Sequence, residues 1–175
     1  GPPCSTTSDV DLTRFAPFGR VVMAFGRGVR RRGGIEVRLR GEEREVLRAV
    51  LGQLRTAIEA DAEDPALRRL FPPAYENDAE KEAGYRALAQ HELLESRLQA
   101  LAAVEASLDS KRLDDDGAAA WLRSLNALRL VLGTRLDVTE EDDHEIDPTD
   151  PDAPAWYLYY FLSGLVDDLV GALSD

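Results

Sequence analysis

The chain has 175 residues, of which 44% are hydrophobic, and its formal net charge is −12. This length predicts one domain with a core of its own, while the acidic balance argues against general nucleic-acid binding, because attraction to phosphates supplies most of such affinity. Cys4 is the one cysteine, which excludes an intramolecular disulfide and a thiolate metal cluster.

The first forty residues predict an arm followed by a small β element. Residues 1–17 are rich in Pro, Ser, Thr and Asp, so we expect a flexible arm. Residues 19–25 have strand character, and residues 35–40 alternate between apolar and charged side chains. Gly33-Gly34 between them is a two-residue turn signal. We therefore expect an antiparallel hairpin or three-stranded meander over about 19–40, with its apolar face on the helices.

Four main helices are expected after the hairpin. Each shows apolar residues at steps of three and four, the period of an α-helix packed on one side. Asp64-Pro65 adds a short helical piece that ends at Pro72-Pro73, and the third helix begins after a cap at Asp115 or Asp116. The expected helices cover about 42–60, 78–108, 116–136 and 154–173.

The helix over about 116–136 is expected at the centre of the fold. Its apolar stripe is wide, because Leu122 and Val131 lie beside a row of five other apolar residues. A helix that is apolar over so much of its surface must be packed on several sides. The fold class is therefore mainly α (α+β): one bundle domain over residues 18–175, with about four main helices and a small N-terminal antiparallel hairpin or meander. The row consists of Trp121, Leu125, Leu128, Leu132 and Leu136.

An arginine-rich segment and an acidic segment stand out in the charge pattern. Residues 20–44 contain eight Arg and three Glu, which suggests a docking surface for an acidic partner or for nucleic-acid backbone. The alternative is a solvated hairpin face that the nine acidic residues of 137–152 neutralise at range. The residues that we predict to bind a partner are Arg27, Arg30, Arg31, Arg32, Arg38 and Arg40.

The C-terminal helix and the central helix each carry one further candidate site. The run 156–162, WYLYYFL, is apolar nearly all the way round, so part of it is expected to face a second copy or another protein; simple core packing is the alternative. Asn126 and Arg129 lie one turn apart beside the leucine stripe and are expected to form a structural polar clamp. The predicted interface residues are Trp156, Tyr157, Tyr159 and Phe161.

The sequence predicts neither an enzyme nor a cofactor or metal site. His91-Glu92-Leu93-Leu94-Glu95 begins like a zinc-protease helix, but Glu95 replaces the second histidine. The acidic run 142–152 lacks the glycine of a calcium loop, and no nucleophile–base pair can be assembled. No apolar run reaches the roughly 18 residues of a membrane helix, and no signal-peptide pattern is present. We expect a cytoplasmic protein with no membrane partner.

Several segments resemble the actinobacterial AosR-like family, which was long catalogued as a domain of unknown function and whose genes tend to lie beside the one for the ClpS adaptor. They are WLRSLNALRLVLGTRLDVTEEDD, EVLRAVLGQL, DPALRRLFPPAY and the aromatic C-terminal helix. LNALRLVLGTRL is the specific part, and the resemblance extends from about Phe18 to Leu173.

This resemblance implies a cytoplasmic regulator, responsive to oxidation, that acts on transcription through a sigma factor. The studied branch of the family switches through a Cys-Xaa-Xaa-Xaa-Cys pair, which this sequence lacks, so Cys4 could form a disulfide only with another molecule. We expect a non-enzymatic transcription regulator that contacts a sigma factor or RNA polymerase, and a homodimer is a further expectation. The alternative is an accessory protein of the ClpS–protease quality-control system.

Overall fold

The computed structural model describes residues 29–31, 33–140 and 145–174. The predicted arm, the expected strand over 19–25 and part of the acidic loop therefore lie outside the described residues. The elements, in chain order, are β1 (Val29–Arg31), β2 (Ile35–Val37), α2 (Gly41–Ala60), the 3-10 helix η2 (Pro65–Leu67), α3 (Ala79–Ser107), β3 (Arg112–Leu113), α4 (Asp115–Arg135) and α5 (Ala153–Ser174).

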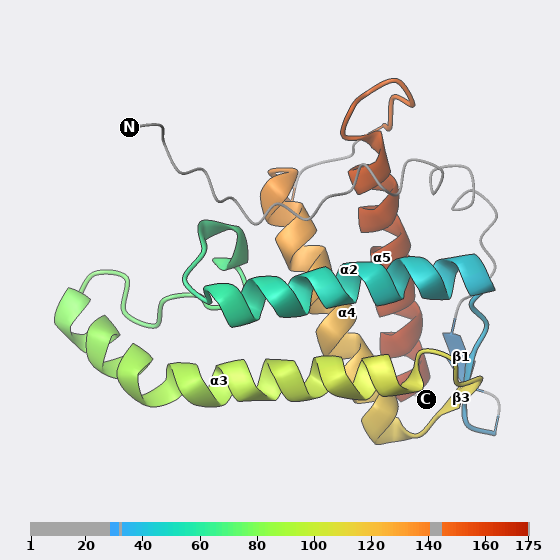
Figure 1. Ribbon diagram of the computed structural model, residues 1–175, viewed down its shortest axis with the longest axis horizontal. Coiled ribbons are helices and arrows are strands. Elements are labelled where there is room, and N and C mark those ends of the chain that lie inside the picture. Colours follow the sequence, from blue (N-terminus) through green and yellow to red (C-terminus); the bar gives the residue numbers. More distant parts are fainter. Residues whose placement is uncertain (1–28, 32, 141–144, 175) are drawn as a thin grey trace.

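The four long helices form two crossing pairs, which confirms the predicted fold class. Helices α2 and α3 run antiparallel and side by side, and the antiparallel pair α4 and α5 crosses behind them (Figure 1). The small sheet closes one end of the bundle (Figure 1). Helix α4 contacts α5, α3, α2, η2 and β3, so it occupies the centre as expected.

The stripe predicted on α2 is buried in the core, with one partial exception. Leu47, Leu51 and Leu54 have no solvent exposure, whereas Val46 is half-buried. Buried Glu43 fixes the start of this helix, because its carboxylate accepts a hydrogen bond from the backbone N–H of Arg40 at 2.8 Å. This is the return half of a capping box, and it satisfies a donor that the helix end leaves unpaired.

Helix α3 is buried over its C-terminal half only. This differs from the prediction that apolar residues along the whole helix would pack on the core. Leu101, Val104 and the following Leu108 are buried, whereas Leu88 is 82% exposed. His91, which we expected on the apolar stripe, is also exposed, with its Nε2 3.5 Å from the Glu95 carboxylate. The physical reason is visible in Figure 1, where the N-terminal half of α3 extends past the ends of the other helices.

Helix α4 begins one residue earlier than the sequence suggested. Its cap is Asp114, whose Oδ1 accepts a hydrogen bond from the backbone N–H of Gly117 at 2.6 Å, rather than Asp115 or Asp116. Those two carboxylates lie in the first turn, where they favour the positive end of the helix dipole. At the other end, Asp137 adopts φ +54°, and the N–H of Val138 donates to the carbonyl of Gly133, which terminates the helix.

We predict that Asp114→Ala lowers the free energy of unfolding by about 1 kcal/mol, the typical effect of losing a helix N-cap. Urea unfolding followed by circular dichroism measures the change. Asp116→Ala, in the first turn of the same helix, is the matched control, because it removes a carboxylate near the dipole but no cap bond. Equal losses from both variants would contradict the cap assignment.

The sheet has the order β1-β2-β3 and is antiparallel throughout. Arg31 pairs with Ile35, so three residues form the turn rather than the two predicted; Gly33 and Gly34 both adopt positive φ, which glycine tolerates. The third strand comes from the α3–α4 connection, which the sequence pattern did not indicate. Ile35 and Val37 are buried as predicted, and the N–H of Val29 donates to Asp168 of α5. This bond and the buried face fasten the sheet to the helices.

Helix α5 begins at Ala153, one residue before the predicted start, and buries most of its apolar stripe. Leu165 and Leu169 lie in the core, but Tyr160 is 39% exposed. Phe161 occupies the buried position next to it, because α5 packs mainly on α4 and β1.

Candidate functional site

Arg38 and Arg40, the hairpin arginines whose side chains the structure describes, are paired within the chain. Arg38 forms an ion pair with Glu36 at 3.2 Å, and Arg40 forms one with Glu43 at 3.1 Å. Arg44 donates to the carbonyls of Leu108 and Ser110 at the end of α3. The guanidinium groups therefore meet the chain's own acceptors, which weakens the case for a cationic docking surface at these positions.

The structure does not test the other residues that were predicted to bind a partner. Arg30 and Arg31 contribute backbone to β1, where Arg30 pairs with Glu36. Arg27, Arg32 and Cys4 lie outside the described residues. Their role as partner-binding or redox residues stays a prediction.

The aromatic run of α5 is divided between the interior and the surface. Trp156 and Phe161 are buried within the chain, and Tyr157 and Tyr159 are half-buried. The Trp156 ring stacks on that of Tyr160 with centroids 6.1 Å apart. An intermolecular contact through this helix would therefore use Tyr160 and the outer parts of Tyr157 and Tyr159, instead of the two largest buried rings.

Asn126 and Arg129 come together, but on one helix. The Arg129 guanidinium donates from Nη2 to the Asn126 side-chain oxygen at 2.9 Å, and both residues are half-buried. This is an (i, i+3) contact along α4. It orients the arginine along the helix, and the role of the pair as a structural polar clamp stays a prediction.

The residues that the structure describes bring together no group of three or more His, Cys, Asp or Glu able to hold a metal ion. Among the same residues, no helix is long and apolar enough to cross a membrane.

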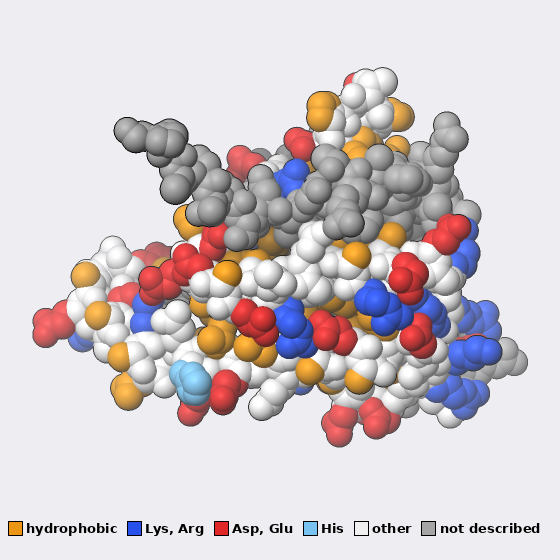
Figure 2. Space-filling view, in the orientation of Figure 1, with side chains coloured by type: hydrophobic (Ala, Val, Ile, Leu, Met, Phe, Trp, Pro, Cys, Tyr) orange, Lys and Arg blue, Asp and Glu red, His pale blue; other side chains and the backbone are white. Residues whose placement is uncertain are grey.

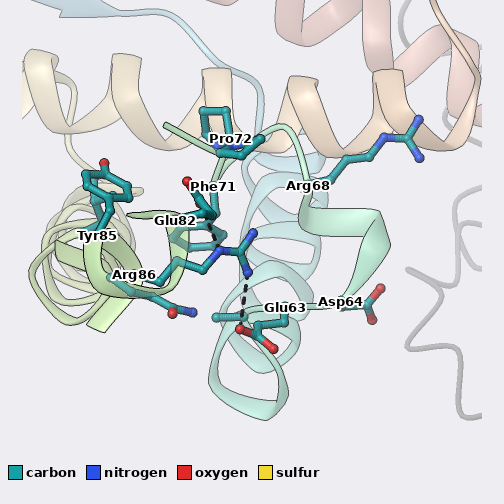
Figure 3. Close-up of a pocket in the computed structure, with 12 residues that line it drawn as sticks. Glu63, Asp64, Arg68, Phe71, Pro72, Glu82, Tyr85 and Arg86 are labelled. Carbon is teal, nitrogen blue, oxygen red and sulfur yellow. Dashed lines mark hydrogen bonds and ion pairs between the residues drawn. The ribbon is translucent and has the colours of Figure 1, made fainter. Parts of the chain in front are cut away.

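A pocket that the sequence did not indicate lies where the projecting half of α3 leaves the bundle. We call it the notch; its volume is about 120 Å³. The turn after α2, the segment that follows η2 and the first half of α3 form its walls (Figure 3). The notch is lined by Ala62, Glu63, Asp64, Arg68, Phe71, Pro72, Pro73, Glu82, Tyr85, Arg86, Gln90 and Leu93.

A chain of ion pairs holds one wall of the notch in place. Arg86 lies between two carboxylates, with Nε 3.1 Å from Glu82 and Nη1 3.3 Å from Glu63 (Figure 3). Glu82 also accepts a hydrogen bond from the backbone N–H of Tyr75 at 2.8 Å. These contacts connect α3, the end of α2 and the segment before α3, so the notch is a defined cavity although its walls come from three parts of the chain.

Aromatic and proline side chains provide the apolar surface of the notch. The ring of Tyr85 meets that of Tyr75 edge to face, with centroids 6.3 Å apart, and Tyr75 is 45% exposed. Phe71 is half-buried under the guanidinium of Arg97, and Pro72 and Pro73 are exposed. Exposed rings and prolines around a small cavity are typical of protein–protein contact sites.

We predict that the Glu82 carboxyl titrates below its ordinary range. The hydrogen bond from the Tyr75 backbone lowers the pKa of Glu82, and the hydrogen bond from Arg86 lowers it further. Because the folded pKa is the lower one, the stabilisation is present above the unfolded value of about 4.3 and is lost as the pH falls through the folded value. Carbon-detected NMR titration of the glutamate carboxyls measures the shift directly.

The lowered pKa of Glu82 should also make the free energy of unfolding depend on pH. The difference in the free energy of unfolding between the wild type and Glu82→Gln should shrink as the pH falls from about 6 to about 3. Glu80→Gln, on the exposed first turn of α3, is the matched control. A difference for Glu82→Gln that is independent of pH would contradict the assignment.

Comparison with known proteins identifies a family for this chain but gives no activity. Residues 23–173 match the model of a family described as a domain of unknown function, DUF2017. No curated protein and no solved structure matches the chain. The family match covers most of the sequence, from the expected hairpin to the end of α5. The chain therefore belongs to the domain-of-unknown-function family DUF2017.

Proposed function

We propose that this protein is a non-enzymatic cytoplasmic regulator of transcription that acts by binding another protein, a sigma factor or RNA polymerase itself. The resemblance to the AosR-like family suggests the class of partner. The observation that carries the proposal is the notch, in which the half-buried rings of Phe71 and Tyr85 and the exposed Pro72 and Pro73 surround a small cavity.

The size of the notch suits one anchoring side chain of a protein partner. A volume of about 120 Å³ accommodates a single leucine- or phenylalanine-sized group, and such anchors contribute most of the affinity at protein interfaces. The backbone around the cavity is positioned by the Glu82 and Arg86 contacts, so little ordering is needed on binding.

The charge around the notch indicates the chemistry of the partner. Residues 59–82 contain eight acidic and three basic side chains, and one of the basic ones, Arg69, donates to the carbonyl of Val138. An acidic rim attracts an apolar anchor that is flanked by Lys or Arg.

The predicted contact through the hairpin arginines becomes secondary in this proposal. Arg38 and Arg40 are already paired with Glu36 and Glu43. An acidic partner that bound the cationic hairpin would also be repelled by the acidic side chains around the notch. The link to oxidative stress rests on the AosR-like resemblance and on the thiol of Cys4. A disulfide of Cys4 could form only with another molecule.

The test is direct binding by the purified chain. The sigma factors of the source organism, RNA polymerase, the ClpS adaptor and its protease are each titrated against it by biolayer interferometry. The proposal expects binding to a sigma factor or to the polymerase, with weaker binding as the salt concentration rises. Binding to ClpS or the protease alone would establish the quality-control alternative. Light scattering of the free chain determines in the same series whether it is a homodimer.

A further inference from the structure

A second cavity, apart from the notch, lies over α4 in the seam between α2 and α3. We call it the groove; its volume is about 280 Å³, and Leu93 alone is shared with the notch. Hydrophobic side chains show between charged ones along this seam (Figure 2). The groove is lined by Leu54, Ile58, Leu93, Ser96, Arg97, Ala100, Leu101, Arg123, Ser124, Asn126 and Ala127.

The floor of the groove is apolar and rigid. Leu54, Ile58 and Leu101 are at most 2% exposed and belong to the central core cluster. Ala100 and Ala127 add small side chains that leave space above this floor. A floor of this kind favours the hydrocarbon part of a small molecule.

Two buried polar groups at the groove lack the partners that buried groups require. Ser124 is 2% exposed, yet its hydroxyl has no hydrogen-bond partner among the described residues. The Nε of Arg97 is likewise buried and unpaired. Leaving such a group unsatisfied destabilises the folded state, so buried unpaired groups are rare away from sites of binding.

The charge of the groove has the opposite sign to that of the protein. Among the described residues that line it, two are arginines and none is acidic. Arg97 donates to the carbonyl of Leu70 and lies 5.5 Å from the ring centroid of Phe71, but forms no ion pair within the described chain. Arg123 on the rim is exposed and forms none there either. Burial without a carboxylate lowers the pKa of Arg97.

A cation held in a half-buried position without an anion is a costly arrangement. In a chain with a net charge of −12, acidic side chains are abundant, and Arg48, Arg55 and Arg86 all pair with them. The absence of such a partner at Arg97 leaves a donor set that a bound anion would complete.

We propose that the groove binds a small monocarboxylic acid with an apolar body. The carboxylate would accept hydrogen bonds from Arg97 and Ser124, with Arg123 at the rim, and the hydrocarbon would lie on Leu54, Ile58 and Leu101. A phosphate-rich ligand suits the groove less well, because its additional oxygens would meet apolar walls. The cavity volume is at the lower end of the range for ligand sites, which restricts the molecule to a small one.

The test is an NMR titration of the full chain with 4-phenylbutyrate, with 4-phenylbutanol and with inorganic phosphate. We expect 4-phenylbutyrate to shift the amide signals of residues 96–101 and 123–127, with a Kd on the order of 1 mM for a ligand of this size. The alcohol has the same apolar body without the charge, and its affinity should be at least about tenfold weaker. Phosphate should produce no saturable shift in these residues.

Two variants assign the carboxylate to its partners. Ser124→Ala should raise the Kd for 4-phenylbutyrate by about threefold or more, while leaving the melting temperature unchanged or higher, because the hydroxyl is unpaired in the free protein. Arg123→Glu should raise the Kd by about fivefold or more. Arg68→Glu, which reverses an exposed charge at the notch instead, is the matched control and should leave the Kd unchanged.

The proposal is overturned if the alcohol binds as tightly as the carboxylate, since the groove would then be an apolar surface without anion recognition. It is equally overturned if Ser124→Ala and Arg123→Glu both leave the Kd within about twofold, or if 4-phenylbutyrate gives no saturable shift. None of these outcomes depends on whether a sigma factor binds at the notch.

Discussion

Replacing Trp121 by alanine should lower the free energy of unfolding by about 3–5 kcal/mol, the range for removing a fully buried aromatic side chain. Trp121 has no solvent exposure and lies on α4, the helix that contacts α5, α3, α2, η2 and β3. Its indole Nε1 donates to the hydroxyl of Ser107 on α3 at 2.8 Å, so the variant also removes a bond between two helices. Urea unfolding followed by far-ultraviolet circular dichroism measures the loss.

Two milder variants separate packing from hydrogen bonding at this position. Trp121→Phe keeps an aromatic ring and should lose about 1–2 kcal/mol, whereas Ser107→Ala leaves the indole donor unpaired and should lose about 1–3 kcal/mol. Leu88→Ala, on the exposed side of α3, is the matched control and should change stability by less than about 0.5 kcal/mol. A Trp121→Ala loss below about 1 kcal/mol would contradict the central position of α4.

Introducing a charge into the notch should abolish the proposed partner contact. Tyr85→Glu removes an apolar wall of the cavity and places a carboxylate where an apolar anchor would sit, so we expect the Kd for the sigma factor or polymerase to rise at least about thirtyfold, equivalent to about 2 kcal/mol. Tyr85 is only half-buried and lies on the projecting part of α3, so the bundle should remain folded. Biolayer interferometry measures the affinity, and circular dichroism verifies the fold.

Leu88→Glu provides the matched control for this experiment. It makes a similar change one turn further along the same helix, but at a residue that is 82% exposed and does not line the notch. It should leave the affinity unchanged. Gln90→Trp is a second variant, which fills the notch without removing any packing, and it should weaken binding as Tyr85→Glu does. Loss of binding with Leu88→Glu but not with the two notch variants would place the contact on the outer face of α3 instead.

The helices could be predicted because their signals are local. The cap at Asp64 and the wide stripe from Trp121 to Leu132 depend on residues within one or two turns of each other. The alternation around Ile35 and Val37 predicted a buried strand face in the same way. The third strand at Arg112 was not predictable, because two residues carry no periodicity and pair only with a partner distant in sequence.

The candidate sites were less predictable than the helices. Leu88 has the helical spacing of a core residue, but it projects beyond the bundle because α3 is longer than the helices it packs on. The expectation of a cationic hairpin depended on charge counts, which do not show that Glu43 is buried beside Arg40. The one signal that could have indicated the notch is the segment FPPAY. Its two prolines interrupt helix formation, so its aromatic rings lie in a connection between helices.

The sequence by itself determined the class of the fold, the extents of four helices and the identity of the helix at the centre, because capping, periodicity and apolar width act within a single element. Only the tertiary structure decided which apolar residues stay exposed and which arginines are paired. It also decided that Ser124 and Arg97, whose hydroxyl and Nε have no partner among the described residues, line one groove with Leu54 and Leu101. Those features depend on where three helices cross, and a crossing is set by the packing of side chains that lie far apart along the chain.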